Sequence, residues 1–211
     1  MNQKTETLDP TNDGHWNRFL HEFRVRYDTT YLNHGSFGIA LNCVRYQRDR
    51  ILRQMEIQPM DFFLRRYEPL LRTARQSLAK FVGTKAQNLA FVDNATYAMN
   101  VVANSVDLKS GDEVLLTDVE YGAVKRIWEE KANRCGATVK FASLPHKITD
   151  RQQVIDAIME SVTPHTKIAV ISHIVSSTAL ILPVTEICKS CLLYTSPSPR
   201  DATLSRMPSS A

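Results

Sequence analysis

The second half of the chain alternates between two hydrophobic patterns. Short apolar runs of strand length are each followed by a longer segment in which apolar residues recur every three or four positions, the spacing of one helix face. The predicted strands are 89–92, 113–117, 138–141 and 167–172, and the predicted helices are 97–106, 123–135, 151–162 and 184–191. Strands that alternate with helices in this order predict an α/β fold built on a parallel sheet.

The pattern before this alternation is helical. Apolar residues recur at helical spacing between Trp16 and Phe23 and predict one short amphipathic helix. Two longer helices are predicted at 41–57 and 61–82. Pro69 lies inside the second of these, and because proline removes a backbone hydrogen bond it predicts a bend or a restart there.

Composition divides the chain into four segments. We expect residues 1–14 to be a disordered N-terminus, 15–87 an N-terminal helical segment, 88–191 a partial α/β domain and 192–211 a disordered tail. The last 20 residues contain five Ser and three Pro and lose all periodicity. Because this break falls inside a predicted helix, we expect foreign sequence on a truncated chain, and a native disordered tail is the alternative.

Charge and cysteine content name no macromolecular partner. The net charge is +4, and the Arg-rich stretch 45–75 is explained by a solvated helix face better than by nucleic acid, since no aromatic-interleaved basic motif accompanies it. No apolar run approaches the ~18 residues of a membrane span. The four cysteines lack the spacing of a disulfide framework, so we expect a cytoplasmic protein. Cys188 and Cys191 form an isolated CxxC, and we assign no metal site to it.

Three loops at the ends of predicted strands hold unusual polar or aromatic residues. Residues 94–96 follow the strand 89–92 and precede a helix, which is the arrangement of a phosphate site; helix capping without a ligand is the alternative. Tyr121 follows the strand 113–117, and its ring could lie over a flat heterocycle or be only partly buried. His173 and Ser176 follow the strand 167–172, although a single histidine at a strand end is more often structural than catalytic. Together the three loops favour a phosphorylated aromatic cofactor.

Four runs of residues resemble a known family. They are YLNHGSFG (31–38), DNATYAMN (93–100), GDEVLLTDVEYGAVKRIWE (111–129) and SHIVSSTALILPV (172–184). In this order they resemble the class V aminotransferases, which are pyridoxal-phosphate enzymes of fold type I, and most resemble the isopenicillin N epimerase-like branch. The resemblance implies an incomplete large domain of the aspartate aminotransferase type, preceded by an N-terminal helical segment.

The resemblance also implies roles for individual residues. Ala95, through its backbone, and Thr96 would hold the phosphate of pyridoxal phosphate. Tyr121 would stack on the pyridine ring, and His173 and Ser176 would lie near the ring substituents or the substrate.

The segment before the sheet would complete the site. Asn33, His34 and Gly35 would line the substrate entrance, and the helices before residue 88 would supply the small-domain and dimer surface. A homodimer is therefore expected, with a small amino acid as the substrate of the full-length form.

The family's lysine, which attaches the cofactor, and its aspartate at the pyridine nitrogen lie on strands after the helix that begins at Val184. The sequence ends before those strands, and neither Lys167 nor Lys189 has a comparable context. We therefore assign no catalytic residue and expect an inactive N-terminal part of an enzyme for transamination, epimerisation or carbon–sulfur cleavage.

Two other hypotheses about the function remain open. The first is a non-catalytic module that binds a phosphate ligand or dimerises. The second is a nucleotide-binding α/β domain, which the lack of a GxGxxG or GxxxxGK run disfavours.

Overall fold

The chain divides into two compact units, a helical unit (Met1–Lys80) and a sheet unit (Phe81–Ala211). The computed structural model describes residues 8–9, 11–26 and 28–194. Of the segments predicted to be disordered, 1–14 and 192–211, residues 1–7, 10 and 195–211 lie outside these ranges, whereas residues 192–194 belong to a helix, which corrects the prediction there. None of the helices in the described part of the chain has the length and apolarity that crossing a bilayer requires.

The helical unit begins with two short turns in place of the single helix predicted between Trp16 and Phe23, so that prediction is wrong. Helix α1 spans Asp13–Asn17 and starts upstream because the Asn12 side chain accepts the Gly14 N–H at 2.9 Å. A 3-10 turn follows at Leu20–Glu22. The start of α1 at Asp13 falls within the 1–14 segment for which disorder was predicted.

Helices α2 (His34–Phe37), α3 (Asn42–Ile57), α4 (Pro59–Asp61) and α5 (Tyr67–Val82) make up the rest of this unit. A wider π turn at Phe62–Arg66 separates α4 from α5. The predicted interruption thus lies one turn before Pro69. Because proline has no N–H to donate to the carbonyl four residues earlier, the turn that precedes it is the one that loosens.

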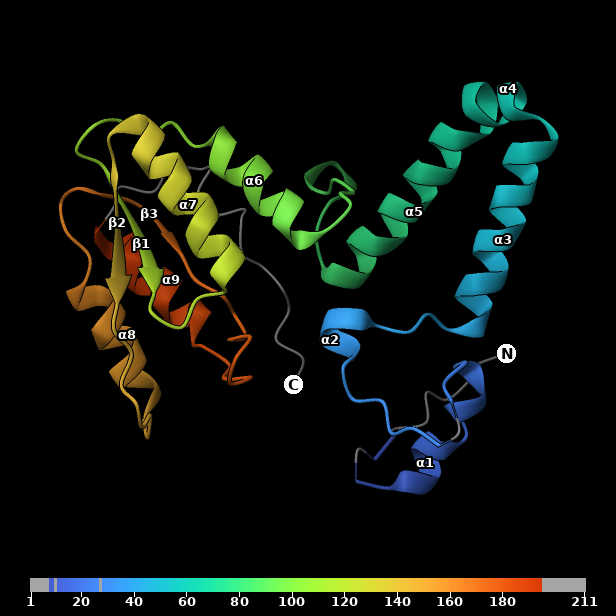
Figure 1. Ribbon diagram of the computed structural model, residues 1–211, viewed down its shortest axis with the longest axis horizontal. Helices are drawn as coiled ribbons and strands as arrows, with labels where there is room; N and C mark the ends of the chain where they lie inside the picture. The colour runs from blue at the N-terminus through green and yellow to red at the C-terminus, as the bar shows by residue number, and fades with distance from the viewer. Residues whose placement is uncertain (1–7, 10, 27, 195–211) are drawn as a thin grey trace. The chain divides into compact units, whose positions relative to one another are not determined.

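The sheet unit contains a parallel three-stranded sheet in the order β2-β1-β3 (Figure 1). The strands are β1 (Glu113–Thr117), β2 (Thr138–Ala142) and β3 (Thr166–Val170), and the helices are α6 (Ala95–Ser105), α7 (Gly122–Cys135), α8 (Arg151–Glu160) and α9 (Val184–Tyr194). The predicted parallel α/β architecture is confirmed.

Helices cover both faces of the central strand β1, whose five residues are all buried. Val114 and Leu116 face a cluster that includes Trp128 of α7, whereas Leu115 faces a cluster that includes Ile158 of α8. Alternate residues of a strand point to opposite faces, so β1 joins two hydrophobic cores. The chain leaves β1 toward β2 and then crosses back to β3, and right-handed crossovers in opposite directions place α7 and α8 on opposite faces.

The strand predicted at 89–92 is absent, which corrects the sequence-based expectation. Leu89 has extended backbone angles, but the segment pairs with no strand among the described residues. Phe91 and Val92 remain 48% and 42% exposed. An apolar run forms a strand only where a neighbouring strand accepts its ladder hydrogen bonds, and none of β1, β2 and β3 lies beside it.

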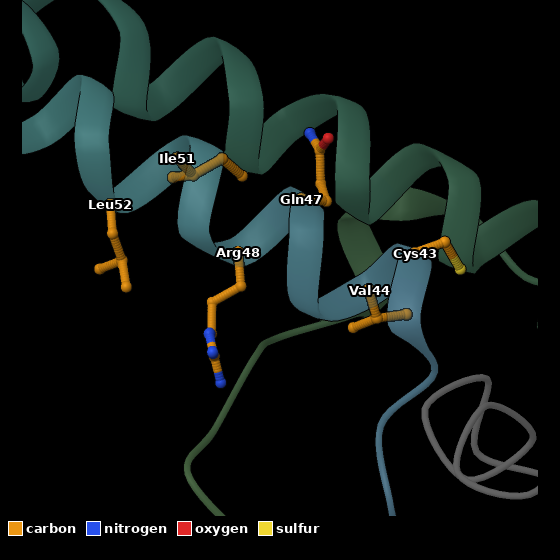
Figure 2. Close-up of a pocket in the computed structure, with 6 residues that line it drawn as sticks. All are labelled: Cys43, Val44, Gln47, Arg48, Ile51 and Leu52. Atoms are coloured by element: carbon orange, nitrogen blue, oxygen red, sulfur yellow. The ribbon is translucent and has the colours of Figure 1, made fainter. Parts of the chain in front are cut away.

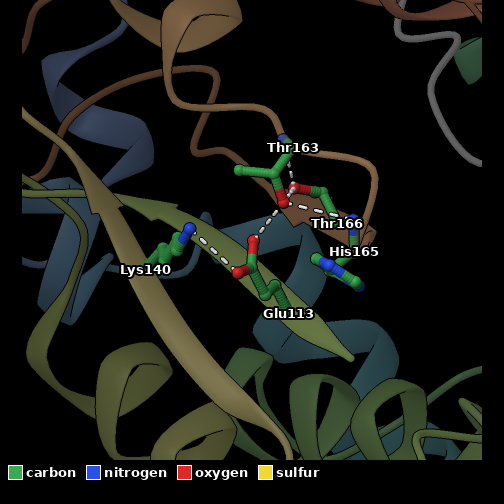
Figure 3. A network of polar contacts seen from close by, with 5 residues as sticks. All are labelled: Glu113, Lys140, Thr163, His165 and Thr166. Carbon is green, nitrogen blue, oxygen red and sulfur yellow. Dashed lines mark hydrogen bonds and ion pairs between the residues drawn. The ribbon is translucent and has the colours of Figure 1, made fainter. Parts of the chain in front are cut away.

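A polar network joins the three strands at their amino ends (Figure 3). The Glu113 carboxylate on β1 pairs with Lys140 Nζ on β2 at 2.8 Å and accepts the Thr163 hydroxyl at 2.5 Å. The Glu113 N–H donates to the His165 carbonyl at 2.9 Å. The hydrogen bond from Lys140, followed by that from Thr163, lowers the pKa of Glu113 below its ordinary value of 4.5.

This network makes stability depend on acid pH. Because the pKa of Glu113 is lower in the folded chain, its contribution is complete above pH 4.5 and is lost as the pH falls through the lowered value. We expect Glu113→Gln to lower the urea midpoint at pH 6 and to have a smaller effect at pH 3. The exposed Glu130→Gln is the control. A Glu113→Gln effect of equal size at both pH values would contradict the role of the network.

Candidate functional site

The carboxyl ends of the three strands share one edge of the sheet (Figure 1). Helix α7, which follows β1, packs on one face, and α9, which follows β3, packs with α8 on the other. Neighbouring strands whose following helices lie on opposite faces form a switch point, the crevice where open α/β sheets bind ligands. The candidate site is therefore the edge beyond β1 and β3.

Helix α6 presents its N-terminus toward this edge. The C-terminal end of α6 leads through 106–112 to the start of β1, and α6 packs beside α7 (Figure 1). Trp128 Nε1 on α7 donates a hydrogen bond to Met99 Sδ on α6 at 3.3 Å, which holds the two helices together. Asn94 caps the helix, and its side chain accepts the Tyr97 N–H at 2.8 Å.

The first turn of α6 leaves donors free. Ala95 and Thr96 are its first two residues, and within the described part of the chain no acceptor bonds their amides. Free amides at the start of an eleven-residue helix, together with the helix dipole, favour an anion.

The loop between β1 and α7 holds Tyr121 at the start of the helix. Tyr121 precedes Gly122, the first residue of α7, and its side chain is 54% exposed. The preceding residue, Glu120, is only 5% exposed. Its Oε1 accepts the Tyr121 N–H at 2.8 Å and the Ser172 hydroxyl at 2.6 Å, and its Oε2 accepts the Ser172 N–H at 2.9 Å.

A second carboxylate in the same loop reaches the other neighbouring strand. Asp118 accepts the Ser143 hydroxyl at 2.9 Å and the Leu144 N–H at 3.2 Å, both just after β2. Its carbonyl accepts Lys125 Nζ at 2.6 Å. Asp118 and Glu120 thus connect the loop after β1 to the loops after β2 and β3.

The loop after β3 is a hairpin. Strand β3 ends at Val170, two residues before the predicted end, because the Ser172 N–H donates to Glu120 and not to β1. The His173 carbonyl accepts the Leu182 N–H at 2.8 Å, and an isolated bridge pairs Ile174 with Ile181. His173 and Ser176 are exposed, and Ser176 lies in the turn.

The structure brings the Tyr121 loop and the His173 loop together through Glu120, a residue that sequence reasoning passed over. The available signal was a pair of acids two positions apart, Asp118 and Glu120, directly after a continuous apolar strand. Such a placement indicates carboxylates that bond the loop backbones at a strand edge.

Residues Asn33, His34 and Gly35 belong to the helical unit, where Asn33 precedes α2. The His34 ring packs edge-on against Tyr31, with ring centroids 5.1 Å apart. Their role at a substrate entrance stays a prediction.

A family model described as aminotransferase class-V matches residues 63–194, more than half of the chain. The chain belongs to the class V aminotransferase family. Family membership confirms the resemblance seen in the sequence, and with it pyridoxal phosphate as the cofactor that the family uses.

Curated relatives show how much of a class V protein the chain covers. It is 39% identical over 163 residues to an isopenicillin N epimerase of Amycolatopsis lactamdurans, covering 76% of the chain and 41% of the relative. It is 29% identical over 174 residues to putative L-cysteine desulfhydrase 1 of Oryza sativa subsp. japonica, covering 76% and 36%. The chain spans about two fifths of the length of these relatives.

Solved structures share the fold. A complex of the cystine C-S lyase C-DES with its product cysteine persulfide has a TM-score of 0.71 at 24% identity, covering 79% of this chain and 44% of that chain. A C-DES mutant with glycine covalently linked to the PLP-cofactor has a TM-score of 0.73 at 24% identity, covering 83% and 46%. The sheet unit is therefore part of a fold type I domain, as predicted.

The residues at the edge fit pyridoxal phosphate chemically. The free amides of Ala95 and Thr96 suit a phosphate, and the exposed ring of Tyr121 suits a flat heterocycle. Thr117, the last residue of β1, adds a buried hydroxyl that has no hydrogen-bond partner within the described ranges.

The hairpin also contains a strained residue. Ala179 has a φ of 56°, a left-handed conformation that favours glycine. We expect Ala179→Gly to raise the free energy of unfolding by about 1 kcal/mol in a urea titration, because it relieves the clash of the Ala179 Cβ atom. The matched control, Ala157→Gly inside α8, should lower it by about 1 kcal/mol. Destabilisation by both variants would contradict the strain.

Proposed function

We propose that this chain forms the phosphate-binding and ring-binding part of a pyridoxal-phosphate enzyme that acts on an amino acid. The observation that carries the proposal is the start of α6, where the amides of Ala95 and Thr96 have no acceptor among the described residues and lie toward the switch-point edge. When bound, pyridoxal phosphate supplies a ring that accepts electrons from the substrate alpha carbon.

In this proposal the helix start binds the phosphate. The Ala95 and Thr96 amides and the Thr96 hydroxyl donate to the phosphate oxygens, and the dipole of α6 adds favourable charge. The position of Asn94 as a cap supports this arrangement, because its side chain takes the Tyr97 amide and leaves the first two amides available.

Tyr121 would stack on the pyridine ring in the proposed site. The Tyr121 side chain is held at the start of α7 by its own backbone hydrogen bond to Glu120, while its face remains open. His173 and Ser176, on the hairpin after β3, are proposed to hydrogen-bond the ring substituents or the substrate. Asn33, His34 and Gly35 are proposed to line the entrance.

For the whole protein we propose epimerisation, transamination or carbon–sulfur cleavage of a small amino acid. The relatives named isopenicillin N epimerase and L-cysteine desulfhydrase support this range. We propose that the covalent attachment of the cofactor does not use a lysine of this chain, since neither Lys167 nor Lys189 has the expected context. The four free cysteines support a reducing, cytoplasmic location.

We further propose that the enzyme is a homodimer. An apolar groove along α3 supports this, since Val44, Arg48 and Leu52 project from one side of the helix a turn apart (Figure 2). Val44 and Leu52 are 53% and 43% exposed. A second copy of the chain would bury them.

The phosphate site is tested by equilibrium binding. We expect saturable binding of pyridoxal phosphate to the purified chain, and we expect Thr96→Val to weaken it about tenfold because a hydroxyl donor to a charged group is lost. Thr138→Val, at the amino end of β2 and exposed, is the matched control and should leave the affinity unchanged.

Two outcomes would count against the proposal. Absence of saturable binding would leave the start of α6 as a capped helix only. Borohydride treatment followed by peptide mass spectrometry should find no pyridoxyl group on any one lysine, and stoichiometric labelling at one position would contradict the assignment of the attachment lysine to another part of the protein.

A further inference from the structure

Glu120 carries a buried carboxylate that forms no ion pair with a cation in the part of the chain that the structure describes. Its oxygens accept three donors, namely the Tyr121 N–H, the Ser172 N–H and the Ser172 hydroxyl, at 2.6 to 2.9 Å. The residue is 5% exposed. A buried carboxylate is costly to leave without donors, so Glu120 holds both partner loops at fixed distances.

The two loops joined by Glu120 come from different strands. Tyr121 lies after β1 and directly precedes α7, and Ser172 lies after β3, directly before His173. The strands are neighbours in the sheet, and Glu120 and Ser172 are 52 positions apart in the chain. The Glu120 carboxylate therefore connects the two loops at the switch point, beside the Tyr121 ring.

We propose that Glu120 is a positioning residue that sets the Tyr121 ring against the His173 loop for the bound cofactor. The inference rests on the proposed function of the site. Tyr121 is constrained through its backbone, adjacent to the carboxylate, whereas its side chain stays 54% exposed and available for stacking. A displacement of either loop would change the distance between the Tyr121 ring and the polar groups of the hairpin.

The chain contains a matched control for a merely structural effect. Glu113 is the first residue of β1, the strand that leads to the Glu120 loop; it is 9% exposed and also accepts two side-chain donors, Lys140 and Thr163. It lies at the amino edge, away from the proposed site. Each of the substitutions Glu113→Gln and Glu120→Gln replaces one acceptor oxygen of a buried carboxylate by an amide nitrogen, which donates and does not accept. Glu113 lies at the amino end of β1, and Glu120 follows its carboxyl end.

The first readout needs no cofactor. Amide hydrogen exchange of the full chain should be at least about tenfold faster in Glu120→Gln than in the wild type at one of the two amides, Ser172 or Tyr121, because the substitution leaves only one acceptor oxygen and one of the two amides loses its acceptor. Glu113→Gln should leave exchange at these two amides unchanged. Unchanged exchange at both amides in Glu120→Gln would overturn the proposed bridge.

The second readout is the bound cofactor itself. We expect Glu120→Gln to weaken binding of pyridoxal phosphate about tenfold and to reduce the induced circular dichroism of its ring, since misplacement by about 1 Å is costly. Glu113→Gln should lower the melting temperature without changing either quantity. Equal weakening in the two variants would overturn the positioning role and leave Glu120 a structural residue.

A milder variant keeps the test decisive if Glu120→Gln does not fold. Ser172→Ala removes only the 2.6 Å hydroxyl contact and leaves the carboxylate in place. It should reduce the induced circular dichroism in the same direction by a smaller amount, and a full wild-type signal would overturn the proposal. Failure of the wild-type chain to bind pyridoxal phosphate would instead refute the proposed function, while the exchange result would still test the bridge.

Discussion

The sheet unit depends on the complete burial of its central strand. All five residues of β1 are covered, so the strand needs a hydrogen-bonded neighbour on each side and helices on each face. Val114 and Leu116 serve one core and Leu115 the other. The polar side chains of the strand therefore lie at its two ends. At these ends Glu113 and the loop beginning at Asp118 contact polar groups from both neighbouring strands.

The two ends of β1 differ in what they leave available. At the amino end, Glu113 is matched by Lys140 and Thr163, and the network only holds strands together. At the carboxyl end, Asp118 and Glu120 bond backbone and hydroxyl groups of the adjacent loops, which leaves the ring of Tyr121 open. The free amides at the start of α6 lie toward this same edge. Because the chain belongs to the class V family, we propose that this edge binds pyridoxal phosphate.

The sequence predicted the strands and helices from β1 onward closely, because their short apolar-rich runs and helix-spaced segments are separated by turn residues. It failed at 89–92, where the same kind of run has no neighbouring strand, and at 16–23, where the Asn12 cap moved the helix start. Hydrophobic periodicity reveals neither the neighbouring strand that a ladder needs nor a cap that lies upstream of the periodic segment. Tyr121 and Ser176 were predicted from their position after strands and stay predictions, whereas the contacts of Glu120 could not be predicted because its partner Ser172 lies 52 residues away.

We propose that the start of α6 is a phosphate site beside the Tyr121 ring. Backbone amide chemical shifts of the full chain, measured during parallel titrations with pyridoxal phosphate and with pyridoxal, test it most directly. We expect pyridoxal phosphate to shift the Ala95 and Thr96 amides and pyridoxal, which has no phosphate, to leave them unchanged. Equal shifts with both compounds, or shifts confined to residues away from α6, would contradict it.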